Sequence, residues 1–143
     1  MRGFLIGAAT LALACGPASP GVSEAPAPKA NSVSKELVRT AETVSQQPLK
    51  LPRGKAEMAA SVVDIPPGGT TTIHQHPWSR FVYVERGAIR VTNFDKHDSL
   101  DFKAGQVFAE VVAQWHQGQA GPDGVHLVVI DLVPPGVTNM KMR

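Results

Sequence analysis

The sequence predicts an all-β domain built as an antiparallel sandwich or barrel. From about residue 56 onward, short runs rich in β-branched and apolar residues alternate with turn-forming residues, and no helical pattern interrupts them. Many short strands at this interval are typical of such folds. The length of 143 residues and the hydrophobic content of 43% fit one domain with one core. The expected strands are 58–65, 70–74, 81–85, 88–94, 100–103, 106–112 and 125–133.

Residues 1–15 are typical of an export signal. Arg2 gives a minimal positive region, residues 4–13 form a short apolar stretch, and small residues precede Cys15. Residues 11–16 resemble the lipobox of bacterial lipoproteins. We therefore expect an exported protein that is lipidated at Cys15 and held at a membrane, in the periplasm or at the outer membrane. An ordinary secretory signal that is cut nearby is the alternative.

Residues 16–50 are expected to form a flexible tether. Its first part, 16–34, is rich in Pro, Ala, Ser and Gly, and it has too few large apolar side chains to offset the entropy of folding. Apolar residues at helical spacing make a short helix an option in 35–46. We place the barrel at 51–136 and a C-terminal tail at 137–143.

The charge pattern excludes one class of partner. The formal net charge is +2 and includes Arg2 of the expected signal, while the other basic residues are scattered along the chain. Nucleic-acid binding requires a basic stripe or patch. We therefore expect no nucleic-acid partner.

Three histidines form the most informative pattern. His74 and His76 lie on an expected strand, and alternate side chains of a strand lie on one face. His116 follows a distant apolar run, so the three imidazoles can meet only if the sheet folds back on itself. Neutral imidazoles suit zinc, copper, iron or nickel. The sequence therefore predicts a divalent-metal site at His74, His76 and His116, and the identity of the ion stays open.

The spacing around the first two histidines resembles the cupin superfamily, small barrels of the jelly-roll or double-stranded β-helix type. The first cupin motif is a glycine, five residues, His-x-His, three or four residues, a glutamate, six residues and a glycine. The matching residues are Gly68, His74, His76 and Gly87. Arg80 stands where the glutamate belongs.

The second cupin motif matches less well, and the whole resemblance covers roughly 56–134. Gly105 and His116 are in place, whereas other residues replace the proline, the second glycine and the asparagine. The replacing residues are Val111, Ala113 and Ala120. In the family, the two histidines, the glutamate and the later histidine bind a divalent metal. The resemblance therefore implies the same three-histidine site, without the family's carboxylate.

Arg80 should not contact the metal, because like charges repel. One hypothesis is that its guanidinium pairs bidentately with a carboxylate of a bound ligand. The alternative is that the side chain turns to solvent. Both stay open at the level of sequence.

Four other residues are weaker candidates. Glu110 precedes His116 and is a candidate fourth ligand, and Trp115 is a candidate for ligand contact. His126 alternates with apolar residues, so it either lines the barrel or is an ordinary core histidine. His97 lies in a charged turn and is expected to be solvated.

Three hypotheses follow for function. The first is an exported cupin with a three-histidine metal centre that acts on or binds a small oxygenated ligand. No general base is visible in the sequence, so catalysis stays open. The second is a non-catalytic lipoprotein that binds a metal or a small ligand, and the third is a metal-free structural cupin. The resemblance also makes a homodimer one option.

Overall fold

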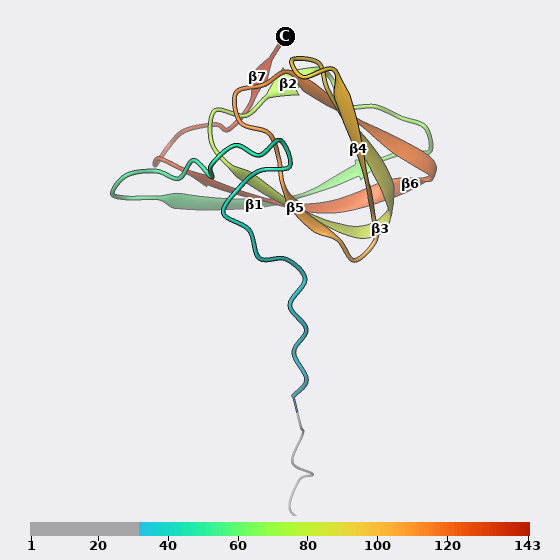
Figure 1. Cartoon of the computed structure of the whole chain (residues 1–143), viewed down its shortest axis with the longest axis horizontal. Helices are drawn as coiled ribbons and strands as arrows, with labels where there is room; N and C mark the ends of the chain where they lie inside the picture. Colours follow the sequence, from blue (N-terminus) through green and yellow to red (C-terminus); the bar gives the residue numbers. More distant parts are fainter. Residues whose placement is uncertain (1–31) are drawn as a thin grey trace, which may run out of the picture. The chain divides into compact units, whose positions relative to one another are not determined.

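The computed structural model describes residues 32–143, and this part of the chain forms strands and no helix (Figure 1). The expected signal, Cys15 and most of 16–34 lie outside the described residues. Within 32–143, nothing forms a helix long and apolar enough to cross a membrane. The strands are β1 Glu57–Ile65, β2 His74–Gln75, β3 Arg80–Asn93, β4 Asp98–Lys103, β5 Val107–Ala109, β6 His116–Val133 and β7 Lys141–Met142.

Two long strands, β3 and β6, carry the sheet. They pair antiparallel from Arg80 opposite Asp131 to Asn93 opposite His116. β1 also pairs with β6, whereas β4 and β5 pair with β3, and all of these pairings are antiparallel. The strand order along the sheet is β4-β3-β6-β2-β7, and β3 and β6 curve strongly in Figure 1. The predicted all-β antiparallel fold is confirmed.

Glycine bulges cause the curvature, and they replace two turns that the sequence suggests. The pairing of β3 with β6 shifts register on both sides of Gly87. Gly87 has a φ of 76°, and a Cβ there would lie 2.0 Å from the carbonyl oxygen of Gly124. Only glycine fits such a close backbone approach. Runs 81–85 and 88–94 therefore form one bent strand, and the Gly-Pro-Asp-Gly segment 121–124 lies within β6.

The strand expected at 70–74 is much shorter in the structure. Only His74 and Gln75 form β2, and Thr70 makes a single bridge to Gln119. The N–H of Thr71 donates to the carbonyl of Gly118 at 2.9 Å. This segment therefore runs beside the first half of β6 and delivers His74 next to His116.

The segment before β1 packs on the barrel. Residues 35–46, where the sequence allows a short helix, form none: 35–40 have no regular structure, and 41–46 contain two bends, a bridge and a turn. The Val44 side chain packs against the core, and its N–H donates to Ala109 at 2.9 Å. The Gln47 side-chain amide bonds both the N–H and the carbonyl of Val112 at 2.9 and 2.8 Å. Part of the expected tether is thus bound to the domain.

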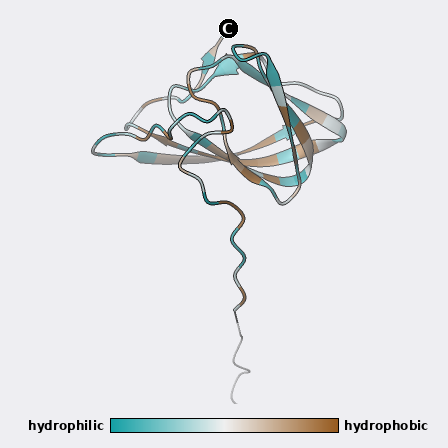
Figure 2. Ribbon diagram, in the orientation of Figure 1, coloured by the Kyte–Doolittle hydropathy of each residue, from teal (hydrophilic) through white to brown (hydrophobic). Residues whose placement is uncertain are grey.

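The hydrophobic core lies inside the curved sheet. Phe108 of β5 stacks on Phe102 of β4, with ring centroids 3.8 Å apart. In Figure 2 the long strands carry apolar residues, whereas β2 is hydrophilic. The buried core residues are Ile65, Val82, Val84, Ile89, Val91, Phe108, Ala120, Val125, Leu127 and Val129.

Candidate metal centre

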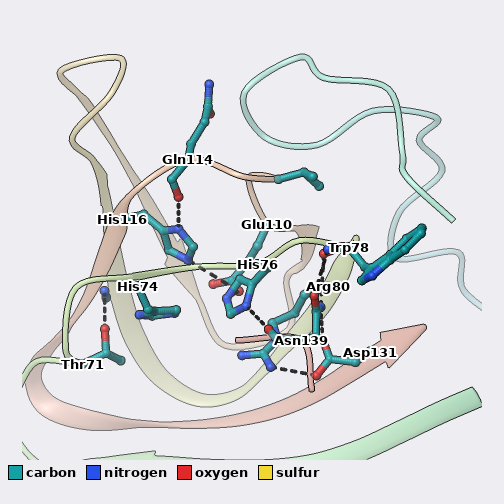
Figure 3. Close-up of polar contacts among 12 residues, drawn as sticks. Thr71, His74, His76, Trp78, Arg80, Glu110, Gln114, His116, Asp131 and Asn139 are labelled. Carbon is teal, nitrogen blue, oxygen red and sulfur yellow. Dashed lines mark hydrogen bonds and ion pairs between the residues drawn. The ribbon is translucent and has the colours of Figure 1, made fainter. Parts of the chain in front are cut away.

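The fold brings the three predicted histidines together. His74 of β2 is paired with His116, the first residue of β6, and the one-residue spacing of His74 and His76 keeps both rings on one side (Figure 3). The ring centroids lie 4.4 to 4.9 Å apart. One ligand atom from each ring lies within 4.8 Å of the others, and all three residues are buried. The spacing suits a shared ion.

The hydrogen bonds of the rings determine which nitrogen is free. In each ring, Nδ1 lies close to a backbone carbonyl oxygen. The partner of His74 is Thr72 at 2.6 Å, that of His76 is Asn139 at 2.6 Å, and that of His116 is Gln114 at 2.9 Å. A carbonyl oxygen only accepts hydrogen bonds, so each Nδ1 carries the proton. Each neutral ring therefore has its lone pair on Nε2, which is the tautomer that metal-binding histidines commonly have.

Two of these Nε2 atoms are buried without a hydrogen-bond partner. They belong to His76 and His116, and they are the only such buried side-chain atoms within residues 32–143. Oε2 of Glu110 lies 3.0 Å from Nε2 of His76, but a carboxylate oxygen only accepts hydrogen bonds and so cannot satisfy this lone pair. Unpartnered buried polar atoms are rare, and each costs about 1–3 kcal/mol. A divalent cation bound to both lone pairs would remove this penalty. The donor set therefore fits a metal ion.

Glu110 places a carboxylate beside two of the histidines. Its Oε2 lies 3.0 Å from Nε2 of His76 and 4.0 Å from Nε2 of His116. The backbone N–H of Glu110 donates to the Arg80 carbonyl at 2.8 Å, so the two residues are neighbours on adjacent segments. Glu110, a weak candidate in the sequence, therefore lies beside the histidines, 30 positions after Arg80 in the chain.

Burial and charge adjust the ionisation of the site. Burial lowers the pKa of His74 to about 4 and also lowers the pKa of His116, so both rings are neutral at pH 7. Burial alone would raise the pKa of Glu110, but its neighbours His76, His116 and Arg80 outweigh burial and lower that pKa to about 2. Neutral imidazoles and an ionised carboxylate are the states that bind a cation.

Arg80 is paired with Asp131, whereas the sequence suggested either a ligand carboxylate or solvent as the surroundings of its guanidinium. Its Nε donates to Oδ1 of Asp131 at 2.9 Å and its Nη2 donates to Oδ2 at 2.7 Å. The two residues face each other across β3 and β6. The guanidinium is therefore not turned to solvent, and one of its two edges is bound to Asp131, while three of its five N–H groups are left for other partners.

Asp131 belongs to the buried face of β6, which the sequence did not reveal. The buried residues of this strand's second half are Val125, Leu127, Val129, Asp131 and Val133. An aspartate in an otherwise apolar inward series needs a buried partner. The other face of the strand is also apolar, and for this reason the sequence pattern failed to show which face is buried. His126 lies on that outer face and does not line the barrel.

The C-terminal tail is part of the site. β7 pairs with β2, with Met142 opposite His74. Asn139 is buried, and its side-chain amide makes three hydrogen bonds. Its Nδ2 donates to Oδ1 of Asp131 at 2.6 Å and to the backbone carbonyl of Trp78 at 3.1 Å. Its Oδ1 accepts from the backbone N–H of Trp78 at 2.9 Å. Its backbone carbonyl accepts from His76. The sequence assigned the tail no role, because a segment of seven residues is too short to give a periodic signal.

Trp115 contacts the same tail and is not among the residues that line the nearby cavity. Nζ of Lys141 lies 5.9 Å from its ring centroid, and the guanidinium carbon of Arg143 lies 6.0 Å away. Such cation–π contacts hold the tail against β6. The predicted ligand contact of Trp115 is therefore not supported by its position.

A cavity of about 110 Å³ adjoins the histidines. His74 and Glu110 form its polar wall with Arg80, and the remainder is mostly apolar. Met140 and Met142 of the tail contribute to the lining. A small ligand in this cavity would touch two of the candidate metal-binding residues.

Comparisons with known proteins agree with this fold. A family model described as "Cupin domain" matches residues 61–133. No curated protein matches the chain.

The structure is similar to three solved structures of low sequence identity, which support a likeness of fold alone. For a DMSP lyase from Ruegeria pomeroyi, the TM-score is 0.51 at 19% identity, over 59% of this chain and 42% of that one. For an oxalate decarboxylase from Lactobacillus farciminis in complex with formate, the TM-score is 0.51 at 24% identity, and the match covers 59% of this chain and 26% of that one. For the Cnp3 cupin domain of Schizosaccharomyces pombe, the TM-score is 0.50 at 20% identity, and the match covers 59% of this chain and 62% of that one. The match thus spans less than two thirds of each of these proteins.

Proposed function

Because this chain belongs to the cupin family, we propose that it is a metal-dependent cupin in which His74, His76 and His116 hold a divalent ion. One observation carries the proposal. Each Nδ1 is bound to a backbone carbonyl, so three Nε2 lone pairs meet in a buried space within 4.8 Å of one another. Three lone pairs repel one another unless a cation lies between them.

Glu110 is proposed as the fourth donor. Its carboxylate adjoins the Nε2 atoms of His76 and His116, and it also lines the cavity. Three imidazoles suit zinc, copper, iron or nickel, and the added carboxylate brings manganese into the same set. A bound ion of this kind supplies Lewis acidity or, if it is redox-active, an electron-transfer centre.

The cavity beside the site is proposed to hold a small oxygenated ligand. His74 and Glu110 meet the ligand at its polar end, and the apolar wall excludes water from the rest. Among the residues that the structure describes, Glu110 is the only carboxylate that lines this cavity. A non-catalytic binding protein would use the same cavity to hold the ligand without changing it.

We also propose that the domain is exported and anchored through a lipid on Cys15, on the basis of the signal and the lipobox-like residues 11–16. Replacing Cys15 by Ser should release the protein from the membrane fraction and abolish incorporation of labelled palmitate. An unchanged distribution would leave the cupin site standing without the anchor.

Elemental analysis of the purified protein tests the metal site. The wild type should contain close to one equivalent of a divalent metal, whereas His74→Ala and His116→Ala should contain little. His126→Ala is the matched control, because it removes an imidazole outside the site. Metal content that does not change in the first two variants would favour a metal-free structural cupin. Turnover of candidate acids and enols under air then separates an enzyme from a binding protein.

A further inference from the structure

One hollow on the surface combines apolar and basic side chains. It has a volume of about 580 Å³, and it is formed by the segment before β1, the loop that carries Trp78, and the residue that follows β6. It shares no lining residue with the cavity beside the histidines. The residues that line it are Leu49, Lys50, Leu51, Arg53, Trp78 and Pro134. The hollow is therefore a feature separate from the candidate metal centre.

The segment that forms one side of this hollow is basic. Between Glu42 and Glu57 the sequence has three basic residues and no acidic one, and the three are Lys50, Arg53 and Lys55. In the part of the chain that the structure describes, none of the three forms a salt bridge. The carboxylate of Glu57 accepts from the N–H of Gly136 at 2.9 Å instead. The positive charge of this segment is therefore open to an anion from outside the chain.

Apolar side chains lie beside these charges. Leu51 is 49% exposed and is flanked in the chain by two of the basic residues. The Trp78 side chain points away from the three histidines in Figure 3, and Nζ of Lys50 lies 4.9 Å from its ring centroid. Tryptophan is enriched where a membrane meets water, and lysine and arginine extend their charged ends from apolar surroundings towards water. This combination of residues is typical of a surface that contacts lipid.

Hydrogen bonds hold both sides of the hollow in place. The N–H of Ser79 donates to the Lys50 carbonyl at 3.1 Å, and the N–H of Lys50 donates to Oγ of Ser79 at 2.7 Å. Ser79 is fully buried. The Asn139 side chain binds both the backbone N–H and the backbone carbonyl of Trp78. Because this surface is already formed, a partner binds it at a lower entropic cost.

We propose that the hollow and its basic segment are a docking surface for the anionic face of a phospholipid bilayer. Anionic headgroups complement Lys50, Arg53 and Lys55, since each basic residue near a negatively charged membrane adds attraction. Leu51 and Trp78 reach the boundary between headgroups and acyl chains, where apolar and aromatic side chains are buried. The proposal goes beyond the proposed metal site and does not depend on it. A lipid on Cys15 would only raise the local concentration of this surface at the membrane.

Tryptophan fluorescence tests which face of the domain meets the bilayer. The chain has two tryptophans, so Trp115→Phe leaves only Trp78 and Trp78→Phe leaves only Trp115. Each variant of the full chain also carries Cys15→Ser, which excludes lipidation. The variants are mixed with vesicles of phosphatidylcholine, with or without phosphatidylglycerol, whose brominated acyl chains quench tryptophan.

Trp78 should be quenched in the anionic vesicles and much less in phosphatidylcholine alone. Trp115 lies against the C-terminal tail and outside the hollow, so it should not be quenched in either. Any membrane contact of residues 1–15 is common to both variants and does not affect this comparison.

Replacing both Lys50 and Arg53 by Gln should weaken binding to the anionic vesicles by about 25-fold, because each basic residue near an anionic membrane contributes about fivefold. Added salt should weaken the binding of the parent chain, since salt screens surface charges. Arg86→Gln with Lys103→Gln is the matched control. It removes the same charge from exposed positions outside the hollow and should leave binding nearly unchanged. Vesicle flotation of the full chain with Cys15→Ser measures these affinities and needs no tryptophan replacement.

Several results would overturn the proposal. Quenching of Trp115 and not of Trp78 would place the membrane contact at the C-terminal tail. An equal loss of binding in the control variant, or equal quenching of Trp78 in both kinds of vesicle, would contradict a specific role of the basic segment. Absence of quenching in the anionic vesicles would exclude the bilayer. If a monomeric short-chain phosphatidylglycerol then still changed the Trp78 emission, the occupant would be a single lipid molecule instead.

Discussion

Two groups of histidines on the same sheet have opposite surroundings. At the buried site, each Nδ1 of His74, His76 and His116 lies against a backbone carbonyl, and the Nε2 atoms face one another. On the outer face, His126 has a carboxylate at each nitrogen: Nδ1 is 2.5 Å from Oδ1 of Asp64 and Nε2 is 3.1 Å from Oε2 of Glu85. Among the described residues, His126 and these two carboxylates do not form a group whose ligand atoms converge on one point, whereas the buried trio does.

The difference shows that the partners of the ring, and not the number of nearby acidic groups, decide what a histidine can do. His126 has more carboxylates around it than any member of the buried trio, yet those carboxylates occupy opposite sides of the ring and cannot share one cation with it. At the buried site a single carboxylate, Glu110, lies on the side where the lone pairs converge. The predictions below test this contrast.

The largest effect is expected from removing a member of the trio. Zinc at 100 times its dissociation constant should stabilise the wild type by about 2.7 kcal/mol, because ligands that bind only the folded state add this linkage energy. His76→Ala should lose nearly all of this stabilisation, and His126→Ala should keep it. Thermal melts with and without zinc measure both. An equal response of the two variants would contradict the contrast between the groups.

Replacing Glu110 by Gln should weaken metal binding by about 10- to 100-fold, because the shape is kept and the charged donor is lost. A competition titration against a zinc chelator measures the affinity. Glu85→Gln, at the carboxylate that contacts His126, is the control and should leave the affinity unchanged. If both variants bind metal like the wild type, Glu110 is not a donor and serves the ligand alone.

Asn139→Ala should have a smaller effect, about tenfold or less in metal affinity. The side chain acts through His76, which it positions by holding the backbone carbonyl that accepts from Nδ1. Lost buried hydrogen bonds should also lower the free energy of unfolding by about 1–3 kcal/mol. Asp64→Asn is the comparison at His126 and should change stability by less than about 1 kcal/mol, with no effect on metal. Metal affinity that is unchanged in Asn139→Ala, despite lower stability, would reduce Asn139 to a structural role.

Acid should destabilise the metal-free protein over a window set by His74. Burial lowers the pKa of His74 to about 4, whereas the unfolded value is about 6.5. Between these values the unfolded chain takes up a proton that the folded protein does not, so the free energy of unfolding falls as the pH drops from about 6.5 to about 4. The full stability from this residue is present above about pH 6.5, and its contribution is constant below about pH 4. Burial of His116 acts in the same direction.

Urea unfolding at a series of pH values, with metal removed by a chelator, measures this slope. His74→Phe should flatten it, because phenylalanine fills a similar volume and does not titrate. A variant with the wild-type slope between pH 6.5 and pH 4 would show that His74 does not cause the loss.

The family motif and the strand alternation predicted much of the fold and the centre of the site. Glycines at Gly68 and Gly87, the His-x-His pair and the distant His116 were enough to expect a curved antiparallel sheet with converging imidazoles. The motif could not show that the chain around Gly87 is a bulge within one strand. A glycine at positive φ serves a turn and a bulge equally well, and only the approach of Gly124 distinguishes them.

The sequence by itself determined the all-β class, the three imidazoles and the missing carboxylate at position 80. The tertiary structure alone decided that Glu110 lies beside His76, that Asp131 pairs with Arg80, and that the backbone carbonyl of Asn139 in the tail accepts from His76. The physical reason is that local pattern fixes which side of a strand a residue faces only where one side is polar. Contacts between residues far apart in the chain depend on the curvature and register of the whole sheet, which no short window of sequence contains.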